Sequence, residues 1–173
     1  FLTNLMNGEG VSYYARGGKK SELFYVNGVE EGLMIEYYKT GEISAVTNFV
    51  EGYEHGEYIE LYKTGDTATL GQFFYGAEDS LWFEFYLNGA LMSEGNYYLG
   101  LIDGMWYEYY DNGILAAEGE YFEGMQVGVW KEYYESGKLK AIGEYYDGLR
   151  EGNWQSFYEN GKLEMENYSE SKW

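Results

Sequence analysis

The sequence repeats itself every 24 residues, and this period constrains the fold more than any other feature. Glycine recurs at that spacing in three series, which hold 19 of the 25 glycines and are interrupted only at Ser80. The members are Gly17, Gly41, Gly65, Gly89, Gly113, Gly137, Gly161; Gly28, Gly52, Gly76, Gly100, Gly124, Gly148; and Gly8, Gly32, Gly56, Gly104, Gly128, Gly152. A tyrosine series is in phase with them: Tyr14, Tyr38, Tyr62, Tyr86, Tyr110, Tyr134, Tyr158. Self-similarity of this kind indicates a tandem repeat array.

Each repeat reads as two short strands joined by a turn. In one repeat, residues 129–134 and 139–145 are rich in strand-forming residues and flank the Ser136-Gly137 step. Such a step supplies the positive φ of a tight two-residue hairpin turn, which would place Tyr134 opposite Leu139. Between repeats the pattern is Gly-x-x-x-Gly, as from Gly148 to Gly152, and it predicts a longer connection.

The sequence therefore predicts an all-β fold. We expect an elongated single antiparallel meander of about seven tandem 24-residue β-hairpin repeats, an open solenoid with no globular centre. The predicted units of this single array over residues 1–173 are 4–27, 28–51, 52–75, 76–99, 100–123, 124–147 and 148–173. The first and last depart most from the pattern, as capping units do.

Alternation along a strand places Trp130, Glu132 and Tyr134 on one face. With the predicted register, Trp130 lies opposite Gly143, and Trp106 with Gly119 and Trp82 with Gly95 repeat this pairing. An indole over a glycine covers backbone without a steric conflict. The aromatic series has two interpretations, packing on the sheet or a platform that binds a ligand or partner.

The net charge of −19 argues against direct contact with nucleic acid or an anionic membrane, because both need basic surfaces. The chain has no cysteine, which fits a reducing compartment and favours the cytoplasm, while a cysteine-free secreted protein is the alternative. No signal peptide is visible, although the chain opens on Phe1 and is expected to be a fragment or a mature form.

Acidic residues dominate the middle of the chain. Between Thr64 and Trp130 there is no Lys or Arg, and eleven acids fall there. They are Asp66, Glu78, Asp79, Glu84, Glu94, Asp103, Glu108, Asp111, Glu118, Glu120 and Glu123. Charge repulsion that keeps exposed strands apart explains this block, and so does recognition of a basic partner.

No residue pattern predicts catalysis, a cofactor or a metal. The carboxylates Glu36, Glu60, Glu84, Glu108 and Glu132 recur at one repeat position, whereas a catalytic pair is needed once, in a pocket. His55 is the only histidine, and its place in a connection predicts an exposed loop residue. No calcium-binding loop of the Asp-x-Asp-x-Asp-Gly type occurs.

The units "YFEGMQVGVWKEYYESGKLKAIGEY" (121–145) and "YYDGLREGNWQSFYENGKLEMENY" (145–168) resemble MORN repeats, the membrane occupation and recognition nexus motif. They are most similar to the bacterial variant of that motif, whose chains are often labelled antitoxins of toxin–antitoxin systems. The resemblance covers nearly the whole chain and weakens before residue 50. It implies a β-hairpin solenoid with a binding or scaffolding role. Lipid association, suggested for other MORN proteins, fits poorly with the charge of this chain.

We therefore predict a non-enzymatic scaffold that binds another protein with a basic surface through an acidic, aromatic sheet face. The alternative is an acidic antitoxin or inhibitor that blocks the nucleic-acid channel of a basic toxin, nuclease or defence effector. A glycan-binding protein is a third interpretation, from its aromatics and carboxylates. The candidate contact residues are Glu84, Glu94, Asp103, Glu108, Glu118 and Glu120 with Trp82, Trp106, Trp130 and Trp154.

Overall fold

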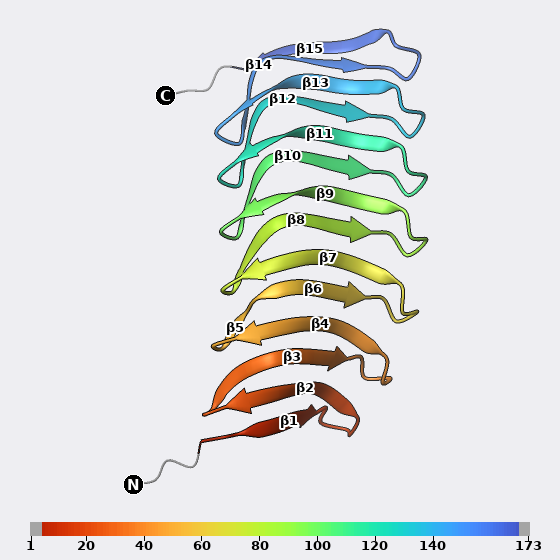
Figure 1. Ribbon diagram of the computed structural model, residues 1–173. Coiled ribbons are helices and arrows are strands. Elements are labelled where there is room, and N and C mark those ends of the chain that lie inside the picture. The colour runs from red at the N-terminus through yellow and green to blue at the C-terminus, as the bar shows by residue number, and fades with distance from the viewer. Residues whose placement is uncertain (1–4, 170–173) are drawn as a thin grey trace. The chain divides into compact units, whose positions relative to one another are not determined.

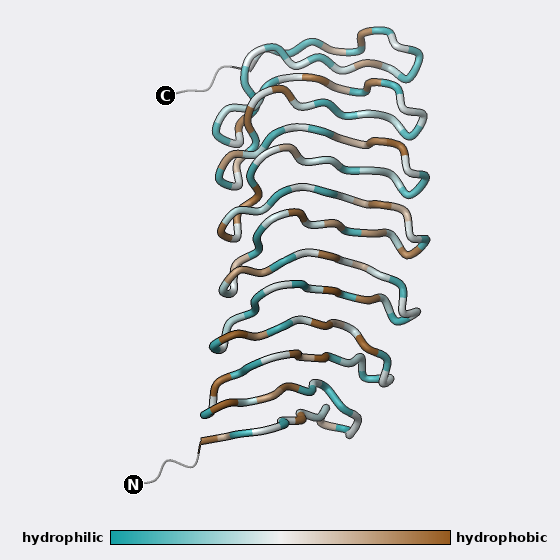
Figure 2. Tube along the Cα trace, in the orientation of Figure 1, coloured by the Kyte–Doolittle hydropathy of each residue, from teal (hydrophilic) through white to brown (hydrophobic). Residues whose placement is uncertain are grey.

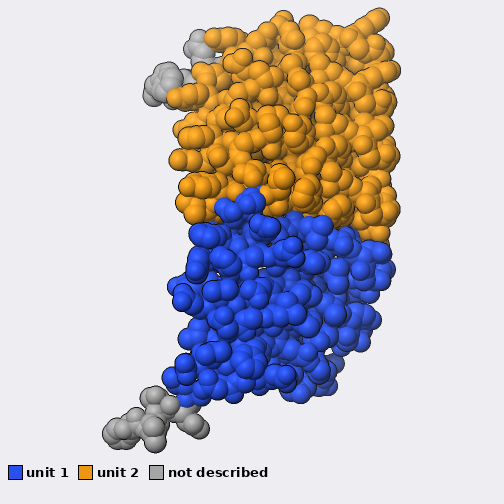
Figure 3. Space-filling view, viewed as in Figure 1, with its two compact units in different colours: residues 1–80 blue, residues 81–173 orange. Residues whose placement is uncertain are grey.

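The computed structural model describes residues 5–169 and contains strands and turns in that range, with no helix. The chain divides into two compact units, residues 1–80 (unit 1) and residues 81–173 (unit 2), which are coloured separately in Figure 3. Residue 4 of the first predicted repeat and residues 170–173 of the last lie outside the described range.

Unit 1 consists of consecutive antiparallel strands (Figure 1). These are β1 (Gly8–Tyr13), β2 (Lys19–Val26), β3 (Val29–Tyr37), β4 (Ile43–Val50), β5 (Tyr53–Glu54), β6 (Gly56–Leu61) and β7 (Thr67–Phe74), with β8 (Ala77–Phe85) crossing into unit 2. Unit 2 continues with β9 (Leu91–Tyr98), β10 (Leu101–Tyr109), β11 (Leu115–Phe122), β12 (Met125–Tyr133), β13 (Leu139–Tyr146), β14 (Leu149–Phe157) and β15 (Leu163–Ser169).

Hydrogen-bonded strands follow one another in chain order, and the short strand β5 pairs with β4. The described strands form one open antiparallel sheet of 15 strands. This topology confirms the predicted all-β meander of hairpin repeats.

The turn within each repeat has three residues, so the two-residue prediction was wrong. Tyr134 N donates to Lys138 O at 2.8 Å, and Gly137 N donates to Tyr134 O at 2.8 Å. Only Gly137 of the loop residues has positive φ, at 79°. This is a three-residue loop with a left-handed glycine at its end, and it pairs Tyr133 rather than Tyr134 with Leu139.

The tight turn lies instead at the junction between repeats, where a longer connection was predicted. Leu99 and Gly100 have φ of 50° and 82°, and Tyr98 pairs directly with Leu101. Two successive left-handed residues make a type I′ turn, whose twist matches that of the strands it joins. The second glycine of the junction pattern marks an irregularity inside the next strand, where Gly104 has φ of 97°.

The core cluster of unit 2 lies on one face of the sheet. It consists of Trp106, Trp130, Ala141 and Trp154, against which Ile102 and three tyrosines pack. Those tyrosines are Tyr97, Tyr121 and Tyr145. The prediction that stacked aromatics replace a globular centre is confirmed for unit 2.

Candidate partner-binding surface

Strand register assigns the candidate residues to two faces. Trp106 pairs with both Gly95 and Gly119, and side chains of paired residues lie on one face of a sheet. We call the face that carries Trp106, Trp130 and Trp154 the Trp face. Residues displaced by one position lie on the opposite face.

The indoles of the Trp face pack on glycines, but each lies over the glycine of the strand before it. A Cβ built at Gly119 would meet the ring of Trp130 at 2.1 Å, and one at Gly143 would meet Trp154 at 2.2 Å. The predicted register of Trp130 with Gly143 is confirmed, but the indole leans the other way. Each ring therefore connects one repeat to the preceding one.

Tyrosine rings fill the spaces between the indoles. Tyr121 meets Trp106 and Trp130 edge-on, with ring centroids 6.2 and 5.2 Å away, and Tyr145 repeats the arrangement between Trp130 and Trp154. The four candidate tryptophans are only 5–9% exposed. Their burial indicates packing and leaves no open indole face on which a sugar ring could stack.

Tyrosines of the 24-residue series link neighbouring repeats within each unit. Tyr110 Oη donates to Tyr133 O at 2.6 Å, and Tyr134 Oη donates to Phe157 O at 2.8 Å. In unit 1, Tyr38 Oη donates to Leu61 O at 2.7 Å. We call these bonds the tyrosine staples.

The six candidate acids do not share a face. Glu84 and Glu108 are exposed on the Trp face, two residues beyond Trp82 and Trp106. Glu118 pairs with Tyr107 and Glu120 with Met105, which places both on the opposite face together with Glu94. Asp103 accepts a hydrogen bond from the backbone N of Glu123 at 3.3 Å and so supports the next tight turn.

Two acids of the opposite face are held by tyrosine hydroxyls. Tyr109 Oη donates to Glu94 at 2.7 Å, and Tyr133 Oη donates to Glu118 at 2.7 Å. Lys131 Nζ lies 2.9 Å from Glu118, and the hydrogen bonds from Lys131 and then Tyr133 lower the pKa of that carboxyl. Burial, followed by the bond to Glu94, raises the pKa of Tyr109 to about 12.

Sequence analysis missed these pairs, although the repeats contain a signal for them. Where the strand ends on tyrosine, a glutamate stands 15 residues earlier, as for Tyr109 and Tyr133. Where it ends on Phe157, the corresponding residue is Ile142. The matched change of both positions indicates a diagonal cross-strand contact.

Two hollows on the Trp face repeat each other at a distance of one repeat. The first, of about 380 Å³, is lined by Glu84, Glu108, Trp106 and two tyrosines of the staple series, Tyr86 and Tyr110. The second, of about 350 Å³, is lined by Glu108, Glu132, Trp130, Tyr110 and Tyr145, with Lys140 also contributing. Carboxylates beside aromatic rings attract cations.

The MORN repeat variant family matches the chain in four segments, residues 78–97, 102–123, 126–146 and 150–170. Each segment covers two strands joined by a three-residue turn. Over these four segments the chain is similar to an array of MORN repeats. No curated protein matches the chain. The repeat is a scaffold element, and the open sheet built from it is consistent with a binding scaffold.

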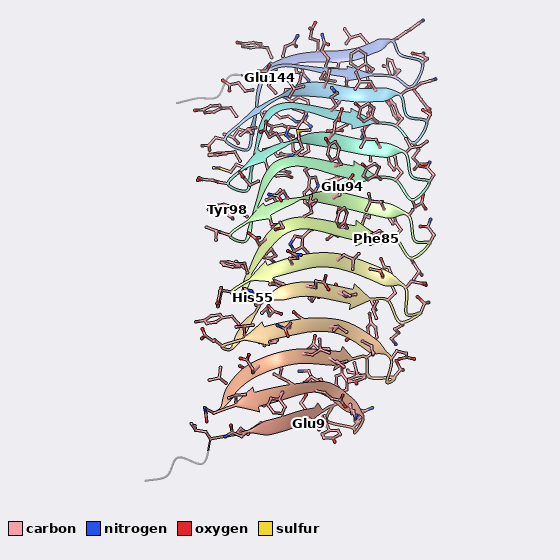
Figure 4. The ribbon with its side chains drawn as sticks, viewed as in Figure 1. Glu9, His55, Phe85, Glu94, Tyr98 and Glu144 are labelled. Carbon is pink, nitrogen blue, oxygen red and sulfur yellow. The ribbon has the colours of Figure 1, made fainter. Side chains whose placement is uncertain are left out.

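Unit 2 also carries an apolar row that sequence analysis did not single out. In unit 2, large apolar side chains beside the tight turns are 49–63% exposed. They are Tyr98, Leu99, Leu101, Phe122, Tyr146 and Leu149, which we call the apolar row. Figure 2 shows apolar residues around the β9–β10 turn, and Tyr98 is labelled there in Figure 4. The signal was the recurrence of apolar residues on both sides of each junction glycine.

A shallow hollow interrupts this row. It has a volume of about 260 Å³ and is lined by Tyr98, Leu99, Leu101 and Phe122, with Asp103 and Glu123 at its margin. Exposed apolar surface of this kind is typical of an interaction site.

His55 is half-buried rather than an exposed loop residue, so that prediction was wrong (Figure 4). Its ring lies 4.8 Å from that of Tyr75 and 5.3 Å from that of Phe74. The neighbouring rings cover the imidazole because the tight turn brings Phe74 and Tyr75 back over the junction. In residues 5–169, no three His, Asp or Glu side chains gather as metal ligands would. No helix able to span a membrane occurs in the same range.

Proposed function

We propose that this chain is a non-enzymatic scaffold that binds a protein with a basic, partly apolar surface. The observation that carries the proposal is the apolar row of unit 2, whose six large side chains are 49–63% exposed. A lone protein rarely exposes many large apolar side chains close together, and a partner that covers the row would bury apolar area at roughly 25 cal/mol per Å².

The charge of the chain favours a basic partner over a second copy of itself. Asp103 and Glu123 border the hollow in the row, and the chain carries a net charge of −19. Two copies meeting at this row would bring like charges together, whereas Lys or Arg beside apolar residues would complement it.

A peptide library displayed on phage tests the proposal. The wild-type chain is compared with a row variant, Tyr98→Ser with Phe122→Ser and Tyr146→Ser, and with a control in which exposed Tyr13 and Tyr168 become Ser. We expect the wild type and the control to enrich peptides that combine basic and apolar residues, and the row variant to lose them. Equal enrichment by the row variant, or enriched peptides without basic residues, would contradict the proposal.

A narrower candidate is an acidic inhibitor, of the antitoxin kind, that occupies the nucleic-acid channel of a basic protein. It is favoured by the 64–130 segment, which holds eleven acids and no Lys or Arg. For a partner found in the screen, this version requires competition with RNA or DNA and a steep loss of affinity with salt. Simultaneous binding of partner and nucleic acid would exclude it.

The glycan interpretation has less support, because the four tryptophans are buried. A glycan array probed with the wild-type chain tests it, and binding to a defined sugar would reopen it.

A further inference from the structure

Acidic and aromatic side chains line the two hollows of the Trp face. In another repeat, the corresponding acidic and aromatic side chains bind Lys and Arg side chains of the chain itself. The first hollow brings together Glu84 and Glu108, and the second brings together Glu108 and Glu132. Both lie within unit 2, on the face opposite to Glu120 and Glu144. This inference goes beyond the proposed function, because the hollows lie on the Trp face. Tyr98 and Leu101 of the apolar row are each one position from the Trp-face residues Tyr97 and Ile102, so they lie on the opposite face.

The last repeats show what this position accepts. Lys140 Nζ and an Arg150 guanidinium nitrogen each lie 3.5 Å from Glu132. The guanidinium carbon of Arg150 also lies 4.0 Å from the centroid of the Trp154 ring. Glu132 and Trp154 therefore hold two cations supplied by the chain.

The corresponding positions in the two preceding repeats have no basic residue, although the glutamate and the tryptophan are present in both. One repeat before Lys140 and Arg150 stand Ala116 and Gln126, and two repeats before stand Met92 and Ile102. The acceptors remain, because Glu108 and Glu84 correspond to Glu132, and Trp130 and Trp106 correspond to Trp154.

The staple tyrosines show the same contrast. In unit 1, Lys39 Nζ lies 5.9 Å from the ring centroid of Tyr14, and Lys63 Nζ lies 5.7 Å from that of Tyr38. The corresponding neighbours of Tyr86 and Tyr110, the tyrosines that line the hollows, are the acids Asp111 and Glu135.

The first hollow is the more open to an incoming charge. Glu84 and Glu108 are both exposed, and the hydrogen bond described for them comes from the neutral hydroxyl of Ser93, 2.8 Å from Glu84. In the second hollow, Glu132 already faces Lys140 and Arg150.

We propose that these hollows receive basic side chains of a protein bound to the Trp face, with arginine preferred to lysine. A guanidinium group donates five hydrogens in one plane, so it can bridge two carboxylates while it lies against a tyrosine or indole ring. Successive hollows are one repeat, or two strands, apart, which is about 10 Å. Two arginines seven residues apart on an α-helix are separated by about 10.5 Å.

The probe is an alanine-based helical peptide with two arginines seven residues apart. It is added to the ¹⁵N-labelled chain, and the indole N–H signals of Trp106, Trp130 and Trp154 are followed. We expect the first two to shift and Trp154, already covered by Arg150, to remain. A peptide with citrulline in place of arginine, and one with the arginines four residues apart, should bind more weakly.

Two matched double variants separate a site from general attraction. Glu84→Gln with Glu108→Gln changes the hollows, and Glu120→Gln with Glu144→Gln removes the same charge from two exposed glutamates one repeat apart on the opposite face. We expect about a tenfold loss of affinity for the first pair, as for a charged hydrogen bond, and less than about twofold for the second. Equal losses would overturn the inference.

A gain-of-site variant provides a test that does not depend on loss of binding. Lys140→Ala with Arg150→Gln gives the last position the composition of the second hollow, and Lys138→Ala with Lys162→Gln is its charge-matched control. We expect the Trp154 signal to respond to the peptide only in the former. If the indole signals of Trp154 in this variant and of Trp106 and Trp130 in the wild type do not shift when the arginine peptide is added, the inference is wrong. Binding of library peptides at the apolar row would still support the proposed function.

Discussion

Unit 1 and unit 2 have the same turns but different packing on the Trp face. At the positions of the indoles, unit 1 has Met34 and Tyr58, and opposite Met34 it has Thr47 instead of glycine. The tight turns nevertheless match, with φ of 52° and 82° at Asn27-Gly28 and 50° and 82° at Leu99-Gly100. The turns and the tyrosine staples are therefore common to the repeats of both units. Packing of tryptophan on glycine is one of several side-chain arrangements found on the Trp face.

Adding a methyl-bearing side chain at the glycine position should give the largest difference between the units. Gly119→Val places atoms inside the Trp130 ring, which lies 2.1 Å from the new Cβ, and should cost about 3 kcal/mol of unfolding free energy. Thr47→Val in unit 1 should instead stabilise by about 1 kcal/mol, because the buried Thr47 hydroxyl has no hydrogen-bond partner among the described residues.

Urea unfolding measures both changes. All five tryptophans lie in residues 81–173, so fluorescence reports on unit 2 and circular dichroism reports on both units. A Gly119→Val chain as stable as the wild type would show that the indole column is not a tight packing element. It would remove the principal distinction between the two units.

The staples should matter equally in the two units. Tyr110→Phe and Tyr38→Phe each remove a hydroxyl that donates to a carbonyl, at 2.6 and 2.7 Å, and should each cost about 1 kcal/mol. Tyr158→Phe serves as the reference, because Tyr158 is 50% exposed and should change stability little. A large effect in only one unit would mean that the units do not share a common scaffold.

The sequence predicts the repeat and the strands because period and alternation act on every residue. It misassigned the turns because Asn-Gly and Ser-Gly steps fit both two-residue and three-residue loops. What separates them is the φ of the residue before glycine, which is positive at Leu99 but not at Ser136. A leucine carries no sequence signal for that conformation.

Site prediction was limited in a different way. The candidate acids were chosen from charge alone. Only the observed strand register shows that Glu108 lies on one face of the sheet and that Glu118 and Glu120 lie on the other. The hollows were not predicted because they occur where Ala116 and Met92 stand at the repeat position of Lys140. The missing basic side chain is recognised only when the repeats are compared with one another.

The tight turns offer an exchange between the units. Leu99 holds a left-handed φ of 50° that disfavours a bulky residue, whereas Asn27 at 52° tolerates it. Leu99→Asn should raise the stability of the chain by up to about 1 kcal/mol, and Asn27→Leu should lower it by a similar amount. Thermal unfolding checks both.

A stability gain at Leu99 together with weaker selection of library peptides would indicate that the strained leucine is retained for binding. A gain with unchanged selection would remove Leu99 from the apolar row's contact surface. No gain at all would show that the turn conformation does not limit stability in either unit.

The smallest effect concerns two tyrosines that resist ionisation for different reasons. Burial raises the pKa of both Tyr109 and Tyr58 to about 12. The next cause is the hydrogen bond to Glu94 for Tyr109, and the charges of nearby glutamates, first Glu60, for Tyr58. Since these folded-state values exceed the ordinary 10.0, the stability each tyrosine contributes is complete below pH 10 and is lost as the pH rises towards about 12.

Ultraviolet titration of the wild-type chain and of the single variants Tyr109→Phe and Tyr58→Phe resolves the two groups. Subtracting each variant's curve from that of the wild type gives the titration of the one tyrosine replaced. Glu94→Gln should lower the pKa of Tyr109, because a neutral amide no longer opposes the phenolate, and burial should keep the value above 10.0. Tyr58 should titrate as before, since Glu94 is not among the groups that shift it. An unchanged Tyr109 would mean that burial alone sets its pKa, and the glutamate–tyrosine pairs of unit 2 would then contribute to packing rather than to electrostatics.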